Sequence, residues 1–285
     1  PRLYVAADGP RADRAAEAEK VAKVREIATA VDWPCEVKTL FREENLGCKY
    51  AVSGGITWFF EHEEQGIILE DDCLPSQSFF WFCEEMLEFY AKESRVMCIT
   101  GTNITKGIRF SDDLWFSNYA LMWGWATWRS AWKKYDRDLS TWPIKRDDGF
   151  LYKKLKFNSA QKSLWNSILD KTYEGTIDTW DYQWIYSCWT NNGLTIAPAS
   201  NLIRNLGFCD DATHTFGDDP YRSNLAHEEI KFPLKQPLEL SVNSDADAFI
   251  SQKWFHATWL NLSKSLILRL PGANVVNRMR KRIFR

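Results

Sequence analysis

The chain has 285 residues, of which 45% are hydrophobic and 26% are charged. These proportions exclude a disordered chain, a fibrous repeat and a coiled coil. The 36 basic and 38 acidic side chains give a net charge of -2, so no overall positive field favours nucleic acid as a partner. The apolar runs are far too short to cross a bilayer.

Strands and helices are expected to alternate over residues 1–100. The expected strands cover 3–7, 36–41, 66–69 and 96–100, and the expected helices cover 12–31, 48–63 and 76–92. After about residue 102 the pattern loosens, with helices near 151–173 and 179–192, a strand near 194–204 and a loop-like segment at 207–245. The sequence therefore predicts an α/β fold with a mostly parallel central sheet flanked by helices, and a less regular second half.

The seven cysteines form no C-x-x-C pair and have no zinc-like spacing. Cys83, Cys98 and Cys188 lie inside apolar runs and are expected to be small buried hydrophobic residues. This use of cysteine indicates a reducing, cytoplasmic location.

Aromatic residues are unusually frequent, with 15 Trp, 10 Tyr and 17 Phe. Aromatic side chains dominate buried area, so a large core accounts for many of them. Flat aromatic faces also pack against the C–H groups of sugars, and both interpretations stay open for Trp123, Trp125 and Trp128.

Three consecutive carboxylates, Glu70, Asp71 and Asp72, end an apolar strand and are followed by Pro75 and Ser76. Ligands of open α/β sheets bind beyond the carboxyl ends of strands. Adjacent anions repel one another unless a positive charge offsets them, and carboxylate oxygens suit Mg²⁺ or Mn²⁺. The alternative is a solvated turn whose acids favour the dipole of the next helix.

These residues resemble known motifs. The segment ILEDDCLPS (68–76) resembles the acidic D-x-D-type motif of GT-A-fold glycosyltransferases, in the E-D-D form of the Golgi N-acetylglucosaminyltransferase family. FREENLGCKYAVSGGI (41–56) resembles the stretch that precedes this motif in inverting enzymes. Three later segments resemble a bacterial group of nucleotide-diphospho-sugar transferases that is sometimes labelled haemolytic-protein-like: WGWATWRSAW (123–132), TWDYQW (179–184) and NLGFCDDATHT (205–215). The resemblance covers about residues 1–220.

The resemblance implies a metal-dependent, inverting sugar transfer from a nucleotide-diphosphate donor. Asp72 would be the direct metal ligand, Asp71 would contact ribose or support the metal, and Glu70 would brace the site. Asp8 and Asn45 lie in segments similar to those that contact the nucleotide, and His214 resembles a late histidine that binds metal or diphosphate. A UDP-sugar is the expected donor.

Inverting transfer also needs a carboxylate base that deprotonates the acceptor hydroxyl. Asp181 is our candidate, with Asp178 and the pair Asp210 and Asp211 as alternatives. A purely structural reading makes Asp178 the N-cap of the helix near 179–192 and Asp181 its third residue. Trp125 and Trp180 are expected to contact the acceptor, a glycan or a lipid-linked molecule.

Positive side chains are further candidates to face the diphosphate. The candidates for this contact are Arg42, Lys49 and Arg129. The competing interpretation is that each is solvated at the surface. The segment 261–285 holds seven basic residues and no acid among Leu, Ile, Val and Phe, a composition that also permits peripheral contact with an anionic membrane.

The expected organisation is a transferase domain at 1–245 and a basic helical extension at 246–285. The GT-A fold normally opens with one more strand ahead of the one that ends in Asp8, and this strand is expected to be missing from the sequence as given. Two other functions stay open: a non-catalytic carbohydrate-binding protein on the same scaffold, and a nucleotidyltransferase that makes the activated sugar.

Overall fold

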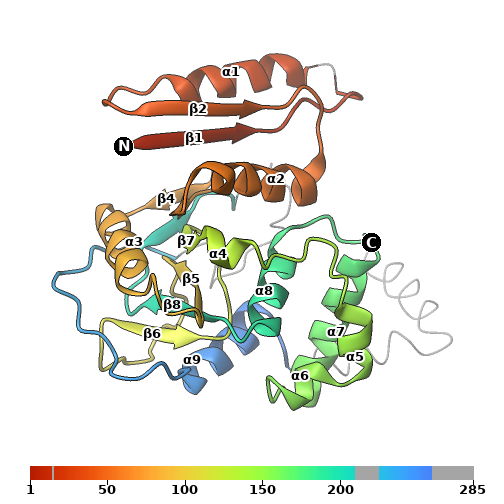
Figure 1. The fold of residues 1–285 in the computed structure, drawn as a ribbon, viewed down its shortest axis with the longest axis vertical. Coiled ribbons are helices and arrows are strands. Elements are labelled where there is room, and N and C mark those ends of the chain that lie inside the picture. The colour runs from red at the N-terminus through yellow and green to blue at the C-terminus, as the bar shows by residue number, and fades with distance from the viewer. Residues whose placement is uncertain (15, 209–224, 259–285) are drawn as a thin grey trace, which may run out of the picture.

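The computed structural model describes residues 1–14, 16–208 and 225–258 (Figure 1). The chain starts with a βαβ unit in which β1 (Arg2–Ala7) and β2 (Glu36–Phe41) pair in parallel. Figure 1 shows α1 (Glu17–Thr29) on one side of this pair and α2 (Gly47–His62) on the other. No residue of α1 is buried, and neither strand contains a buried residue.

The main sheet has five strands in the order β3-β7-β5-β8-β6. Its strands are β3 (Gln65–Ile68), β5 (Val96–Thr100), β6 (Leu114–Ser117), β7 (Trp125–Trp128) and β8 (Leu194–Pro198). Within this sheet β5 and β8 run parallel, whereas the β3–β7, β5–β7 and β6–β8 pairs are antiparallel.

The prediction of a mostly parallel central sheet is therefore wrong. A parallel neighbour needs a long crossover that is usually helical, whereas a chain that returns directly lays its next strand antiparallel. No helix separates β5, β6 and β7 along the chain, so the direct connections of residues 101–124 set the mixed order.

The sheet is buried on both faces by two apolar clusters. On one face α3 (Gln77–Phe89) packs through Phe79, Phe82 and Met86. The opposite face is covered by a tryptophan-rich cluster that includes Trp125 and the helices after β7. Alternate residues of one strand serve the two clusters, as Trp125 and its neighbour Ala126 do, because successive side chains of a strand point to opposite faces.

The second half of the chain supplies most of the helices around this cluster. They are α4 (Arg129–Trp132), α5 (Trp142–Asp147), α6 (Phe150–Lys153), α7 (Ser159–Tyr173) and α8 (Asp181–Thr190). The helix expected at 151–173 is divided into α6 and α7. Lys156 adopts a positive φ of 58°, and Asn158 then begins α7 with a capping box formed with Gln161.

Residues 244–258 pack against the main fold. α9 (Ser244–Phe249) leads into a π-helical turn, η1 (Ile250–Trp254), and Ala246 and Ile250 belong to the tryptophan-rich cluster. The basic segment 261–285 lies outside the described residues. Within the described ranges no helix has the length and hydropathy needed to span a membrane.

The prediction that Cys83, Cys98 and Cys188 are buried is confirmed, since all three side chains are inaccessible. None of the six cysteines in the described part of the chain forms a disulfide.

Candidate functional site

The acidic residues 70–72 form a turn between β3 and the short strand β4 (Cys73–Pro75). The amide of Cys73 donates to the carbonyl of Glu70 at 3.0 Å and closes this turn. Asp71 is exposed, while Glu70 and Asp72 are partly buried. The three carboxylates therefore follow the end of β3, a partly buried edge strand, rather than ending a fully buried one.

Strand β9 (Ile203–Asn205) holds the next part of the chain against this turn. It pairs antiparallel with β4, and the amide of Leu206 donates to the Asp72 carbonyl at 2.7 Å. A β-carbon at Gly207 would lie 2.3 Å from Asp72 Oδ2, so any larger residue here would require the Asp72 side chain to move. Gly207 was not among the predicted site residues, and its only signal in the sequence is its place within the motif 205–215.

Asp181 is the first residue of α8 and lies at the acidic turn. Its Oδ1 accepts from the Tyr182 amide at 2.8 Å and from the Thr179 hydroxyl, which orients the carboxylate. The preceding residue, Trp180, donates its indole N–H to Glu70 Oε1 at 3.1 Å. The start of α8 and the acidic turn, 110 positions apart in the sequence, are thus in direct contact.

The carboxyl groups of Glu70, Asp72 and Asp181 lie close enough for their charges to raise the pKa of neighbouring groups. Burial, followed by the charges of Asp72 and Asp181, raises the pKa of Glu70 to about 7, against the lowering effect of the Trp180 hydrogen bond. Burial together with Asp181, Glu70 and Asp178 raises the pKa of the Cys48 thiol to about 12. The charges of Asp72 and Asp181 therefore both reach the partly dehydrated Glu70 carboxyl, and a cation would be stabilised there.

Asp178 does not cap the helix that follows it, so the prediction that it is the N-cap of the helix near 179–192 is wrong. Its two carboxylate oxygens accept from the amides of Cys48 and Lys49, both at 3.0 Å, and so cap α2. The N-cap residue of α8 is Trp180, which makes no side-chain capping bond, and Asp181 is the first rather than the third helical residue. Long-range capping of this kind depends on tertiary structure and leaves no local sequence signal.

Asp8 caps the same end of α2. Its carboxylate accepts from the amides of Leu46 and Gly47 at 3.0 and 3.2 Å, and from the adjacent Gly9 amide at 3.0 Å. Asp8 and Asp178 thereby satisfy the amide groups that the first turn of α2 leaves unpaired. The hydrogen bonds of Asp8 thus hold the loop after β1 against the start of α2. Its contact with a nucleotide stays a prediction.

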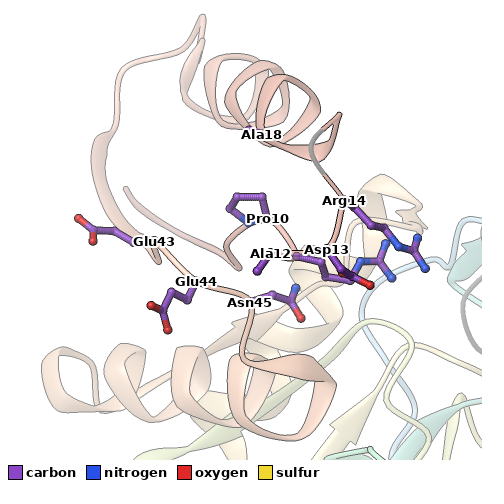
Figure 2. A pocket seen from close by; sticks show the side chains of 9 residues that line it. Pro10, Ala12, Asp13, Arg14, Ala18, Glu43, Glu44 and Asn45 are labelled. Carbon is purple, nitrogen blue, oxygen red and sulfur yellow. The ribbon is translucent and has the colours of Figure 1, made fainter.

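An open groove of ≈ 750 Å³ lies beside this loop (Figure 2). Its lining comes from the segment after β1, from the start of α1 and from the end of the β2 loop, where Asn45 lies. The Asn45 side chain donates to the Gly9 carbonyl at 3.1 Å and joins the two loops. Asn45 and the Asp8 loop, both predicted to contact the nucleotide, therefore border the same groove.

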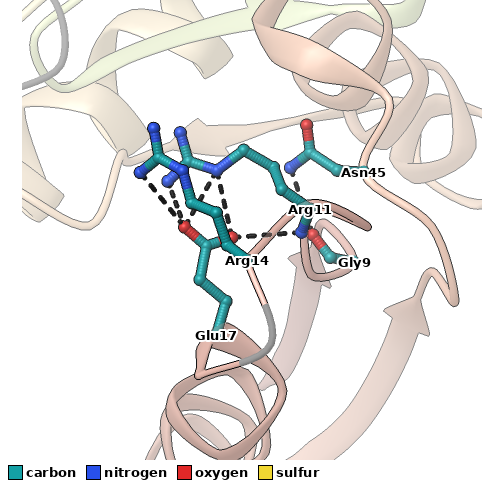
Figure 3. A network of polar contacts seen from close by, with 5 residues as sticks. All are labelled: Gly9, Arg11, Arg14, Glu17 and Asn45. Carbon is teal, nitrogen blue, oxygen red and sulfur yellow. Dashed lines mark hydrogen bonds and ion pairs between the residues drawn. The ribbon is translucent and has the colours of Figure 1, made fainter.

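Figure 3 shows what holds the rim of this groove. Arg11 and Arg14 both pair with Glu17 at the start of α1. The Arg11 guanidinium, together with the Arg11 amide, lowers the pKa of Glu17 to about 2. The rim is therefore shaped by an ion-pair cluster, and its arginines already have an acidic partner.

The three positive side chains proposed to face a diphosphate differ in their partners. Lys49 Nζ lies 2.9 Å from Asp138, and the Arg129 guanidinium pairs with Glu64. Arg42 has no ion pair with any described residue, and its Nη2 atom would lie 2.7 Å from a β-carbon on Gly54. Arg42 is therefore the member of this group that is left to meet an anionic ligand.

The tryptophans predicted to contact an acceptor lie in the core. Trp125 is fully buried and Trp180 is 2% exposed, and the two rings stack with centroids 5.6 Å apart. Neither ring presents a face to solvent, so a direct acceptor contact is not open to them in this structure. Trp128 is also buried, whereas Trp123 is partly exposed and is the most exposed of the four.

His214, Asp210 and Asp211 lie outside the described residues. Within the described ranges no three His, Cys, Asp or Glu side chains gather as a ready-made metal site. Mg²⁺ and Mn²⁺ sites often use one or two carboxylates completed by substrate phosphates. The carboxylates at the acidic turn suit that kind of ligation, because their mutual repulsion would be relieved by a divalent cation.

Neither a protein-family model nor a curated protein sequence matches this chain.

Proposed function

We propose that this protein is a metal-dependent, inverting glycosyltransferase of the GT-A type. It would transfer a sugar from a nucleoside-diphosphate donor, a UDP-sugar, to a hydroxyl group of a glycan or lipid-linked acceptor. The observation that carries the proposal is the contact between Trp180 and Glu70, which brings Asp181, the first residue of α8, to the acidic turn. The carboxylates of Asp71 and Asp72 suit a cation, and the carboxylate of Asp181 lies beside the turn to act as a base.

Each residue has a defined part in the proposed reaction. Asp181 accepts the proton of the acceptor hydroxyl while the hydroxyl oxygen attacks the anomeric carbon and the bond to the diphosphate oxygen breaks. Asp72 and Asp71 would hold a divalent cation, whose chemistry at this place is stabilisation of the departing diphosphate charge. The groove beside Asn45 would receive the nucleoside, and Arg42 would meet the phosphates.

The orientation of Asp181 supports its role. A general base must be held in place before the proton moves, and the Tyr182 amide and the Thr179 hydroxyl fix its Oδ1. Asp178, one of the alternative bases, caps α2 with both oxygens, so its position serves that helix. Asp181 is therefore the better candidate of the two.

The proposal can be tested with a panel of nucleotide sugars, scored by thermal shift and donor hydrolysis with and without Mn²⁺. Ligands that bind the folded state raise the midpoint of unfolding by mass action, so we expect a Mn²⁺-dependent rise for one nucleotide. Asp72→Asn should remove this dependence on Mn²⁺. A wild-type protein that neither binds nor hydrolyses any nucleotide sugar would refute the proposal.

The base can be assigned with two matched variants. Asp181→Asn should lower turnover at least about 100-fold, the usual contribution of a general base, while leaving the donor-induced thermal shift intact. Asp178→Asn, which keeps one acceptor oxygen for α2, should retain most of the turnover. Equal losses in both variants would contradict the assignment of Asp181.

A further inference from the structure

Trp180 is held rigidly where the chain enters α8. Its ring stacks on Trp125 with an interplanar angle of 23°, and its main-chain carbonyl accepts from the Tyr135 hydroxyl at 3.0 Å. Trp125 lies on β7 opposite Ile68, near the end of β3 that leads into the acidic turn. The sheet that carries the acidic turn therefore also supports the indole of Trp180.

The indole N–H of Trp180 bonds to the acidic turn, whereas the indole N–H of Trp184, four residues further along the chain, does not. Trp184 is fully buried and also lies against Trp125, with ring centroids 5.6 Å apart. Its indole nitrogen makes no hydrogen bond to the acidic turn and faces the Cys98 thiol instead. The N–H of Trp180 instead reaches Glu70 Oε1 at 3.1 Å. Burial alone thus does not explain the contact with Glu70.

This hydrogen bond connects the two parts of the proposed site. Glu70 adjoins the aspartates of the acidic turn, and Trp180 is covalently joined to Asp181. A shift of either segment would break a partly buried hydrogen bond to a carboxyl group. An indole has few rotatable bonds, so the contact fixes distance and direction together.

We propose that Trp180 is a positioning residue that holds the acidic turn and Asp181 in a fixed relation. It acts through Glu70 and Asp181 and touches neither donor nor acceptor. This inference rests on the proposed transfer reaction, and it replaces the acceptor contact that the sequence predicted for Trp180.

The test compares Trp180→Phe with Trp184→Phe. Both substitutions keep a buried ring on α8, but only the first removes a hydrogen bond to the acidic turn. Mn²⁺ binding in the presence of UDP, followed by the EPR signal of free Mn²⁺, gives a measure that is independent of turnover. We expect Trp180→Phe to weaken this binding and to lower kcat at least about 10-fold each, the usual effect of losing an outer partner of a metal site. Trp184→Phe should change both by no more than about twofold.

A double-mutant cycle shows whether Trp180 acts through Glu70. In a Glu70→Ala background Trp180→Phe should have little further effect on Mn²⁺ binding or kcat, because its partner is already absent. Trp184→Phe should combine additively with Glu70→Ala. Full additivity of Trp180→Phe with Glu70→Ala, or equal effects of Trp180→Phe and Trp184→Phe, would overturn the inference.

These results separate the inference from the proposed function. A wild-type protein that binds Mn²⁺ with UDP and turns over a donor, but whose Trp180→Phe variant behaves like Trp184→Phe, keeps the proposed function and loses the inference. A wild-type protein without such binding or turnover refutes the proposed function, and the catalytic role of Trp180 with it.

Discussion

Asp247 is a buried carboxylate where α9 meets β6. The Ser117 hydroxyl donates to its Oδ1 at 2.5 Å, and the amide and side chain of Asn118 donate to Oδ2 at 3.1 and 2.9 Å. Burial nevertheless raises the pKa of Asp247 to about 6, so dehydration outweighs these three hydrogen bonds. Asp247 holds α9 against β6, and the free-energy penalty for ionising its buried carboxyl depends on pH.

The pH dependence of the free energy of unfolding should reveal this ionisation penalty of Asp247. Between the ordinary pKa of 3.8 and the folded value of about 6, the folded protein keeps a proton that the unfolded chain has lost. The free energy of unfolding therefore falls as pH rises through this window, by about 3 kcal/mol in total for this group. Asn does not titrate, so urea unfolding from pH 4 to 7 should show the wild type losing stability relative to Asp247→Asn. A constant difference between the two proteins across this range would contradict the assignment.

The sequence predicted some site residues better than others. The position of Glu70, Asp71 and Asp72 shortly after a strand could be predicted, because an apolar strand followed by charge is a local pattern. The use of Asp178 could not be predicted, because its partners are amides of α2 130 and 129 positions away. For Trp125, residue type cannot distinguish core packing from sugar stacking, and only burial decides it.

At the scale of elements, the break between α6 and α7 illustrates how local signals compete. Lys153, Lys154, Leu155 and Lys156 are good helix formers, and they favour one continuous helix over 151–173. Asn158 and Gln161 carry the opposing signal, a polar cap followed three residues later by Gln. The cap prevails because α7 packs its own face against the core through Trp165 and Leu169.

The capping box should contribute measurably to stability. The Asn158 side chain accepts from the amides of Ala160 and Gln161, both at 3.0 Å, and the Asn158 amide donates to Gln161 Oε1 at 2.9 Å. Asn158→Ala removes the first two bonds and should lower the free energy of unfolding by about 1 kcal/mol in urea titrations.

Asn158→Gly is the matched control for this cap. Glycine is itself tolerated at an N-cap, so it should cost only a few tenths of a kcal/mol. If Asn158→Ala and Asn158→Gly were equally stable, the side-chain cap would not be what starts α7.

At the scale of the whole molecule, burial is unevenly distributed. The five-stranded sheet lies between two apolar clusters, whereas the unit β1-α1-β2 contains no buried residue in its helix or strands. The hydrophobic pattern could predict these three elements, since the pattern is local. It could not predict how they attach to the rest, because β1 contacts α2 through side chains far apart in the sequence.

A few polar and aromatic contacts hold this unit in place. The Tyr4 hydroxyl donates to Glu63 at 2.6 Å, Arg2 pairs with the same carboxylate, and the Tyr4 ring lies edge-on to Trp58. At the other end of β1, Asp8 caps α2. Exposed ion pairs contribute little to stability, so Tyr4 and Asp8 should carry most of the attachment.

Native-state hydrogen exchange should therefore separate the two parts of the molecule. Segments with few buried contacts open below the global free energy of unfolding, so we expect amides of β1 and β2 to exchange at an opening free energy at least about 2 kcal/mol below that of β5. Asp8→Ala removes the cap that ties β1 to α2 and should widen this gap, while Asn158→Ala, in a different helix, should leave it unchanged. Equal protection of β1 and β5 in the wild type would mean that β1-α1-β2 unfolds with the main sheet as one cooperative unit, and the attachment through Tyr4 and Asp8 would then be stronger than its burial implies.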